Sequence, residues 1–359
     1  MTDGNSRRAG SGAPYQNLPP RSFWRTAVAQ PGLFGVQDLH RAKFRISPQD
    51  GIITAGSCFA QHVSRALSDH GYNWLDAEPA PPMLSAATAR RFGYGVFSCR
   101  TGNIYSAALL RQWLEWAFGS RGEDREIWHQ DGRWFDPVRP AAEPDGFASA
   151  EEVWQARERT LRALRQAVKE AKVFIFTMGQ TETWVNAQSG LIYQMCPGTQ
   201  AGAFDADLHQ FINQDAGAVQ DDMAAALSLL RSVNPELSIL LTVSPVPLTA
   251  TAAPGAHALA ANGFTKAVLR AAAGSLAAAY DWVDYFPSYE LLTAPAFGGL
   301  FFEPNKRTVA AEGVAFVMRH FLNSFGAPEE NAALRKLAEG SPEGDSLVCE
   351  EMILDYYRD

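Results

Sequence analysis

Short apolar runs alternate with amphipathic stretches along most of the chain. Four of these runs are rich in apolar or β-branched residues and are bounded by turn residues. They lie at 51–55, 173–178, 238–243 and 282–286. Runs of this length and composition are typical of strands buried on both faces, so the pattern predicts a parallel sheet.

The stretches between these runs repeat their apolar residues at helical spacing. The clearest covers 149–172 and opens with a capping box at Ser149 and Glu152. A helix is also predicted over 59–70, directly after the first run, and another starts from a cap at Asn262. Two further stripes of apolar residues predict helices, and they contain Val219, Met223, Leu227 and Leu230 in one and Val314, Val317, Met318 and Phe321 in the other.

Alternation of strands and helices predicts a three-layer, doubly wound α/β fold with a mostly parallel sheet. We expect a single domain over 21–325, because large α/β domains often exceed the usual domain length. A segment rich in Trp, Arg, Pro and Gly, at about 120–148, interrupts the alternation and is interpreted as a loop insertion. We expect residues 1–20 to be a flexible lead-in and 326–359 to be an acidic, helical C-terminal tail.

Composition excludes several classes of protein. The chain has 359 residues and a formal net charge of −8, which argues against a nucleic-acid partner. Its four cysteines are widely scattered, so neither a metal site nor a disulfide framework is expected. Since no apolar run reaches about 18 residues and no signal peptide is evident, we expect a cytoplasmic protein without a transmembrane segment.

The first strand runs into a glycine turn, Gly56-Ser57-Cys58, and then into a helix. Ligands of open α/β sheets bind at the carboxyl ends of the strands, where a helix N-terminus lowers the pKa of a thiol and stabilises an oxyanion. Cys58 is therefore a candidate nucleophile. The alternative is a small buried side chain, the usual role of a free cysteine and the one assigned to Cys99, Cys196 and Cys349.

The segment Gly56-Ser57-Cys58-Phe59-Ala60 resembles the signature of the GSCFA family. Further segments resemble that family in the same order: 97–105, 177–184, 242–247 and 285–290. The family is itself similar to the SGNH hydrolases, which are flavodoxin-like enzymes that cleave or transfer acyl groups. This resemblance implies that Cys58 occupies the nucleophile position and that Ser57 occupies the position of an aspartate, or serves as a turn residue.

The same resemblance implies an oxyanion hole. Its glycine corresponds to Gly102, and Asn103 beside it offers an amide donor. The third SGNH block, Gly-x-Asn-Asp, falls on 179–182, so Thr181 replaces the asparagine and Glu182 takes the acidic position. Alternatively, Thr181 and Glu182 cap a helix-like segment.

The last SGNH block, Asp-x-x-His, has no counterpart in the sequence, because 302–309 contains no histidine. A general base must therefore come from elsewhere, and His257 is the first choice because it follows the third strand. His209 is the second choice and could instead orient a substrate or anchor a loop. Glu290 could orient a histidine or bind sugar hydroxyls, or be a solvated residue at a helix start.

The insertion carries Trp128, Trp134 and Phe135 near Arg133 and Arg139. Aromatic faces and charged edges suit a sugar, but such side chains more often fasten a long loop to the protein.

Two functions remain open. One is an O-acyl esterase or O-acyltransferase acting on a carbohydrate or polysaccharide ester through Cys58, with no cofactor beyond an acyl-CoA or other acyl donor as co-substrate. The other is a non-catalytic saccharide-binding or assembly module, which loss of the Asp-x-x-His block permits. The partner in either case is a small molecule or a saccharide, and the sequence does not decide the oligomeric state.

Overall fold

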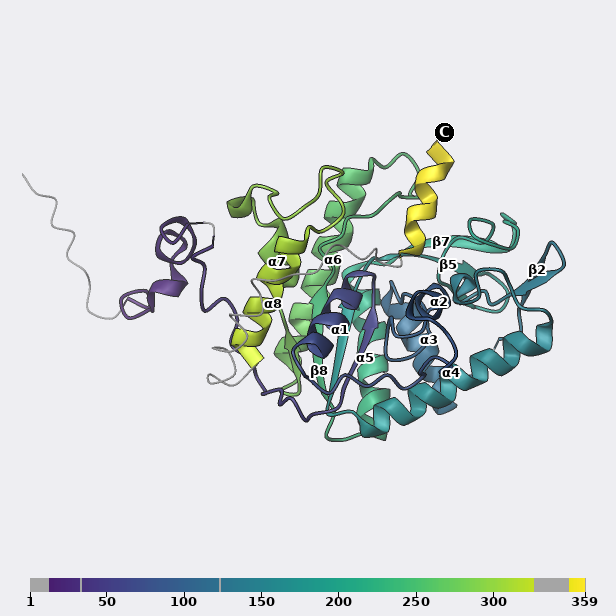
Figure 1. Cartoon of the computed structure of the whole chain (residues 1–359). Helices are drawn as coiled ribbons and strands as arrows, with labels where there is room; N and C mark the ends of the chain where they lie inside the picture. Colours follow the sequence, from purple (N-terminus) through teal and green to yellow (C-terminus); the bar gives the residue numbers. More distant parts are fainter. Residues whose placement is uncertain (1–12, 33, 123, 326–348, 359) are drawn as a thin grey trace, which may run out of the picture.

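A parallel four-stranded sheet forms the centre of the protein (Figure 1). The computed structural model describes residues 13–32, 34–122, 124–325 and 349–358. In spatial order, the strands are β1 (Ile52–Gly56), β4 (Val173–Met178), β8 (Ser238–Val243) and β9 (Val283–Tyr285). These are the four strands that the apolar runs predict, each within two residues of the expected bounds.

Helices cover both faces of this sheet and give three layers (Figure 1). The predicted flavodoxin-like α/β class is thereby confirmed. One face is packed against α3 (Ala107–Phe118), α4 (Ala150–Glu170), α5 (Ala216–Val233) and α6 (Ala258–Ala279). The other face is packed against α1 (Phe59–Asp69), α7 (Ser288–Thr293) and α8 (Ala311–Phe325).

Strand β4 shows why continuous apolar runs form this sheet. All six of its residues are buried. Alternate side chains point to opposite faces of the sheet, and helices cover both faces. Phe174 and Phe176 join the core below α3 to α6, whereas Val173 and Ile175 join the core below α1 and α8.

Local signals set several helix ends. The Ser149 hydroxyl accepts the Glu152 N–H at 3.2 Å, and the Glu152 carboxylate accepts the Ala148 N–H at 3.0 Å, as expected of a capping box. Helix α6 is an exception, since it begins after His257 and not at Asn262. Its cap is the His257 ring, whose Nδ1 accepts the Leu259 N–H, and Asn262 lies inside the first turns.

Secondary structure also forms where none was expected. The insertion contains a hairpin of β2 (Trp128–Gln130) and β3 (Arg133–Phe135), so it is only partly a loop. A small antiparallel sheet follows β4 along the chain, with β5 (Glu182–Asn186) between β6 (Ile192–Tyr193) and β7 (His209–Asn213). The remaining short elements are α2 (Ala86–Arg91) and the helical turns Pro20–Ser22, Arg25–Ala29, Pro140–Ala142, Pro295–Phe297 and Glu350–Arg358 (η5).

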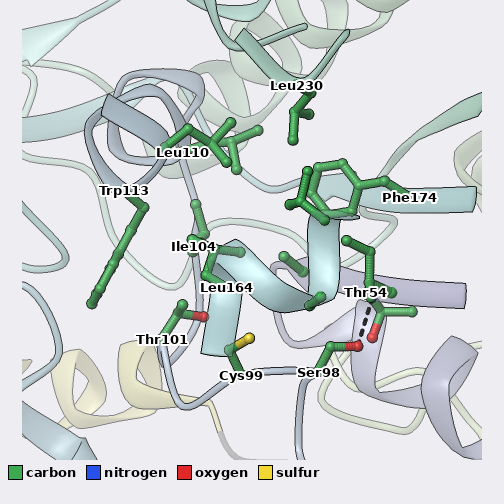
Figure 2. A pocket seen from close by; sticks show the side chains of 15 residues that line it. Thr54, Ser98, Cys99, Thr101, Ile104, Leu110, Trp113, Leu164, Phe174 and Leu230 are labelled. Atoms are coloured by element: carbon green, nitrogen blue, oxygen red, sulfur yellow. Dashed lines mark hydrogen bonds between the residues drawn. The ribbon is translucent and has the colours of Figure 1, made fainter. Parts of the chain in front are cut away.

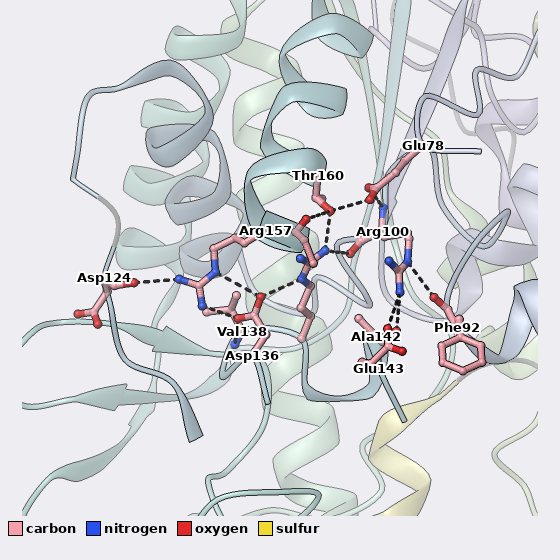
Figure 3. A network of polar contacts seen from close by, with 12 residues as sticks. Glu78, Phe92, Arg100, Asp124, Asp136, Val138, Ala142, Glu143, Arg157 and Thr160 are labelled. Atoms are coloured by element: carbon pink, nitrogen blue, oxygen red, sulfur yellow. Dashed lines mark hydrogen bonds and ion pairs between the residues drawn. The ribbon is translucent and has the colours of Figure 1, made fainter. Parts of the chain in front are cut away.

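A buried ionic network fastens the insertion to α4 (Figure 3). Asp136 lies between Arg139 and Arg157, and the side chains of all three are at most 1% exposed. Burial alone would raise the pKa of Asp136, but Arg157 and Arg139 hold it below its usual value. The network extends through Thr160 to Glu78.

An apolar cavity lies in the core on the face of the sheet that packs against α3, α4, α5 and α6 (Figure 2). Its walls include Cys99, Trp113 and Phe174, and a hydrogen bond of 3.0 Å joins the Ser98 hydroxyl to the Thr54 N–H at its edge. Its lining is mostly apolar, and the polar residues in it are Thr54, Ser98 and Thr101, so it lacks the charged groups typical of a catalytic pocket.

Candidate functional site

Cys58 lies where β1 turns into α1, at the carboxyl edge of the sheet. Gly56 has a φ of +136°, and a side chain there would collide with the Thr177 carbonyl of the neighbouring strand. The turn is closed by a hydrogen bond of 2.9 Å from the Ser57 N–H to the Thr177 carbonyl. Cys58 then occupies the N-cap position of α1, so its thiol lies beside the helix N-terminus as predicted.

A small polar cavity surrounds the thiol. Loops after β1, β4 and β8 build it, as expected for the switch region of an open α/β sheet. Gly179 is required there, since a side chain would approach the Ser57 Cβ to 3.0 Å and the Tyr105 carbonyl to 3.1 Å. The cavity is lined by Ser57, Cys58, Tyr105, Gly179, Gln180, Ser244, Val246, Pro247, Leu248 and Glu351.

The C-terminal segment reaches this cavity and places a second thiol against Cys58. Cys349 and Cys58 share a hydrogen bond, and the Cys349 sulfur lies 3.7 Å from Nη2 of Arg307. The Cys58 hydrogen bond and Arg307 lower the pKa of Cys349 to about 6. The same hydrogen bond, together with burial, raises the pKa of Cys58 well above its usual value. In this arrangement the shared hydrogen bond and Arg307 favour the thiolate on Cys349, and the pKa of Cys58 is raised, not lowered as the sequence predicted.

Two cationic side chains act on the thiols. Nη2 of Arg307 donates a hydrogen bond of 3.1 Å to the Glu351 carboxyl group, and Arg307 also favours the ionised form of Cys58. Lys266 is 1% exposed, donates to the Gly179 carbonyl at 2.8 Å, and interacts electrostatically with Cys58. Burial lowers the pKa of Lys266 to about 8. Burial also raises the pKa of Glu351 to about 8.

Beside the thiols, four residues surround the carboxylate of Glu350, and we refer to Gly102, Asn103, Tyr105 and Gln194 as the carboxylate cradle. The Asn103 side-chain amide and the Tyr105 hydroxyl, the latter at 3.0 Å, donate to Oε2. The Gln194 amide donates to Oε1 at 3.3 Å. Gly102 and Asn103, assigned to substrate or oxyanion binding from the sequence, thus lie together, with Glu350 in front of them.

The structure places the remaining two catalytic candidates elsewhere. His257 is an exposed helix cap, and its ring is not part of the cavity lining around Cys58. Glu182 is the first residue of β5 and accepts hydrogen bonds from the Thr251 hydroxyl at 2.6 Å and from the Ala252 N–H at 3.3 Å. Their hydrogen bonds are those of a helix cap and of a loop anchor.

The other candidates form hydrogen bonds to residues outside the cavity lining around Cys58. Thr181 precedes a strand, so the helix-cap alternative is wrong, and its hydroxyl contacts Asn213 at 2.6 Å and Thr265 at 2.9 Å. His209 is 6% exposed, and its Nδ1 accepts the Asp205 N–H at 3.0 Å, which anchors a loop. Glu290 pairs with Arg270 and accepts the Tyr285 hydroxyl at 2.8 Å.

The aromatic residues of the insertion mostly face the protein. Trp128 is 8% exposed and packs on Tyr193 with ring centroids 5.8 Å apart. Arg139 is buried in the network with Asp136. Both side chains fasten the insertion, which is the alternative that the sequence left open.

Sequence reasoning missed most of the groups around Cys58. Cys349, Glu350 and Glu351 come from the acidic tail, and Gln194 follows β6, so only the tertiary fold brings them together. Two features of the sequence could have pointed to residues of this site. Lys266 lies on a helix that follows a sheet strand, and Arg307 lies in the block where the SGNH histidine is missing.

Across the described parts of the chain, no group of three or more His, Cys, Asp or Glu side chains could hold a metal ion. Among those same residues, no helix is both long and apolar enough to cross a lipid bilayer.

Comparison with known proteins gives one match. A family model described as the GSCFA family matches residues 51–321, which include the central sheet and all helices from α1 to α7. No curated protein matches the chain. No solved structure matches it either.

Proposed function

The chain belongs to the GSCFA family, and from this premise and the surroundings of Cys58 we propose that it is an acyl-transfer enzyme with Cys58 as its nucleophile. The observation that carries the proposal is the position of the thiol at the N-terminus of α1, beside Arg307 and Lys266. Cations and helix N-termini both stabilise a thiolate, which is the nucleophilic form of cysteine.

This arrangement supports a mechanism without a histidine base. In the structure, the bond to Cys349 and burial keep Cys58 protonated. When the segment that carries Cys349 leaves, the first of these effects is lost, while Arg307 and Lys266 still favour the Cys58 thiolate. Departure of the segment therefore activates the nucleophile and opens the cavity to a substrate.

The reaction follows from these groups. The Cys58 thiolate attacks the carbonyl carbon of an ester or thioester, a carbon–sulfur bond forms, and the carbonyl electrons move to oxygen. N–H groups at the start of α1 stabilise that oxyanion. Its collapse breaks the bond to the leaving group, which takes a proton from Lys266, whose pKa of about 8 suits proton exchange near neutral pH. Water or a hydroxyl group then attacks the acyl-cysteine carbonyl and gives its proton back to the neutral Lys266 amine, and the carbon–sulfur bond breaks to release the ester or acid and the Cys58 thiolate.

The substrate class rests on the resemblance to SGNH enzymes. That resemblance favours a carbohydrate or polysaccharide ester, or a saccharide hydroxyl as acceptor. An acyl-CoA or another activated acyl compound serves as donor in the transfer reaction. A thioester intermediate reacts readily with hydroxyls, which favours transfer over simple hydrolysis.

Covalent acylation tests the proposal directly. The full-length protein and its Cys349→Ser variant are incubated with an aryl ester or acetyl-CoA, and intact mass and peptide mapping locate the acyl group. We expect acylation of Cys58, faster in the Cys349→Ser variant because the competing thiol is gone. Cys58→Ala should abolish it, whereas Cys99→Ala, which changes another buried cysteine, should not.

Absence of an acyl-cysteine in both proteins with every donor would favour the competing function, a saccharide-binding or assembly module. Acylation that persists in Cys58→Ala would contradict the nucleophile assignment.

A further inference from the structure

Glu350 is a buried carboxylate whose hydrogen-bond partners are uncharged. It is 8% exposed, and burial raises its pKa. Both oxygens accept hydrogen bonds from cradle side chains, and the Asn103 backbone N–H adds a further bond. Donors that approach both oxygens match the geometry of a carboxylate.

The donors are held in place by contacts that do not involve Glu350. The Gln61 amide donates to the side-chain oxygen of Asn103 at 3.4 Å, which directs the Asn103 amide nitrogen toward the cradle. The Gln194 amide also donates to the Asn103 carbonyl at 2.9 Å. Gly102 has a φ of +67°, and a side chain there would approach the Gln194 amide nitrogen to 2.7 Å. The cradle is therefore preorganised, which lowers the cost of binding an anion.

Packing alone does not explain a glutamate at this position. Removing a carboxylate from water is costly, and an apolar side chain would avoid that cost but would leave the buried donors of Asn103, Tyr105 and Gln194 without their acceptor. The neighbouring Glu351 likewise lies against Arg307 and lines the Cys58 cavity. Two consecutive glutamates, Glu350 and Glu351, thus bind the hydrogen-bond donors that lie near the candidate nucleophile.

We propose that the carboxylate cradle is a binding subsite for a carboxylate of the substrate, and that Glu350 occupies it as an internal substitute. Tyr105 lines the same cavity as Cys58, so a carboxylate in the cradle would place the rest of its molecule near the thiol. The substrate is accordingly an anionic compound, such as an acidic saccharide or a dicarboxylic acyl group. This substrate role rests on the proposed acyl transfer, whereas carboxylate binding itself does not.

Peptide binding in trans tests the cradle. The probe is a fluorescein-labelled peptide of residues 349–358 with serine in place of Cys349. In the wild-type protein the attached segment competes with it at an effective concentration on the order of millimolar. In full-length Glu350→Gln, the amide nitrogen faces the cradle donors and weakens docking of the segment. We expect this variant to bind the probe at least about tenfold more tightly than the wild type, measured by fluorescence anisotropy.

Matched changes separate charge from shape. Glu303→Gln removes an exposed carboxylate away from the cradle and should bind the probe as the wild type does. Glutarate should displace the probe from Glu350→Gln, and the uncharged diamide glutaramide should not. Failure of the probe to bind Glu350→Gln, or equal displacement by both small molecules, would overturn the proposal.

A measurement on the wild-type protein keeps the test valid if Glu350→Gln does not fold. Glutarate that enters the cradle displaces the segment and uncovers Cys58, so brief iodoacetamide labelling of Cys58 should rise severalfold. Glutaramide with sodium chloride at the same ionic strength should leave the labelling unchanged, and an equal rise with both would refute carboxylate recognition. No acyl donor is present in either assay, so the outcome is independent of whether Cys58 becomes acylated.

Discussion

At the scale of single residues, opposing effects act on Cys58. A helix N-terminus and two nearby cations favour the thiolate, whereas burial and a neighbouring thiolate oppose it. The opposing effects prevail in this arrangement, because Cys58 is 3% exposed and shares a hydrogen bond with Cys349. Arg307 lies next to Cys349 and favours the ionised form of that thiol.

The lowered pKa of Cys349 makes alkylation depend on pH in a defined way. Since its pKa is about 6, its reactive thiolate is present at neutral pH and is lost as the pH falls below about 6. We expect iodoacetamide labelling of Cys349 between pH 5 and pH 9, read by peptide mapping, to have its midpoint near 6. Arg307→Met should move that midpoint upward by about one unit.

Cys99 serves as an internal control. It is buried, and burial raises its pKa, so it should stay unlabelled across this range. A midpoint for Cys349 near the ordinary cysteine value of about 8.5 would show that the two thiols are not paired as described.

At the scale of elements, one buried carboxylate, Asp136, joins the insertion to α4. The hairpin β2–β3 is too short to be stable alone, so its attachment to α4 through Asp136 holds it in place. Arg139 and Arg157 would both lose a partner if Asp136 were removed, and a buried unpaired charge is strongly destabilising.

Asp136→Ala is therefore expected to lower the free energy of unfolding by about 3–5 kcal/mol. Asp145→Ala is the matched control, because Asp145 pairs with Arg91 on the surface, where both side chains are more than half exposed. That change should cost less than about 1 kcal/mol. Urea denaturation of both variants gives the comparison, and similar losses would argue against the buried network.

At the scale of the whole molecule, the sheet separates two hydrophobic cores. Leu227 of α5 belongs to one core, and Phe321 of α8 belongs to the other. Side chains in different cores share no neighbours, so changes to them should act independently.

We expect Leu227→Ala to cost about 2–5 kcal/mol and Phe321→Leu about 0.5–3 kcal/mol of unfolding free energy. The double variant should lose the sum of the two, within about 0.5 kcal/mol, in chemical denaturation. Phe286→Leu with Phe321→Leu is the contrasting pair, because these rings are in contact with centroids 5.4 Å apart and should be non-additive. Strong coupling between Leu227 and Phe321 would refute the separation.

Sequence alone determined the features that depend on neighbours in the chain. Apolar runs located all four strands of the central sheet, because strands buried on both faces must be apolar throughout. The capping box located the start of α4, and the glycine turn located Cys58 at the start of α1. The small sheet from β5 to β7 escaped prediction, since its short strands pair through register and not through a strong local pattern.

Only the tertiary structure decided what surrounds Cys58. Cys349, Arg307 and Lys266 lie far from it in sequence, and their contacts exist because distant loops and the C-terminal segment meet at one edge of the sheet. The sequence shows that His257 follows β8, but it could not show that the His257 ring caps α6. Proximity of side chains is a result of long-range packing, whereas the turn that carries Cys58 is encoded locally, by a glycine that its neighbouring strand requires.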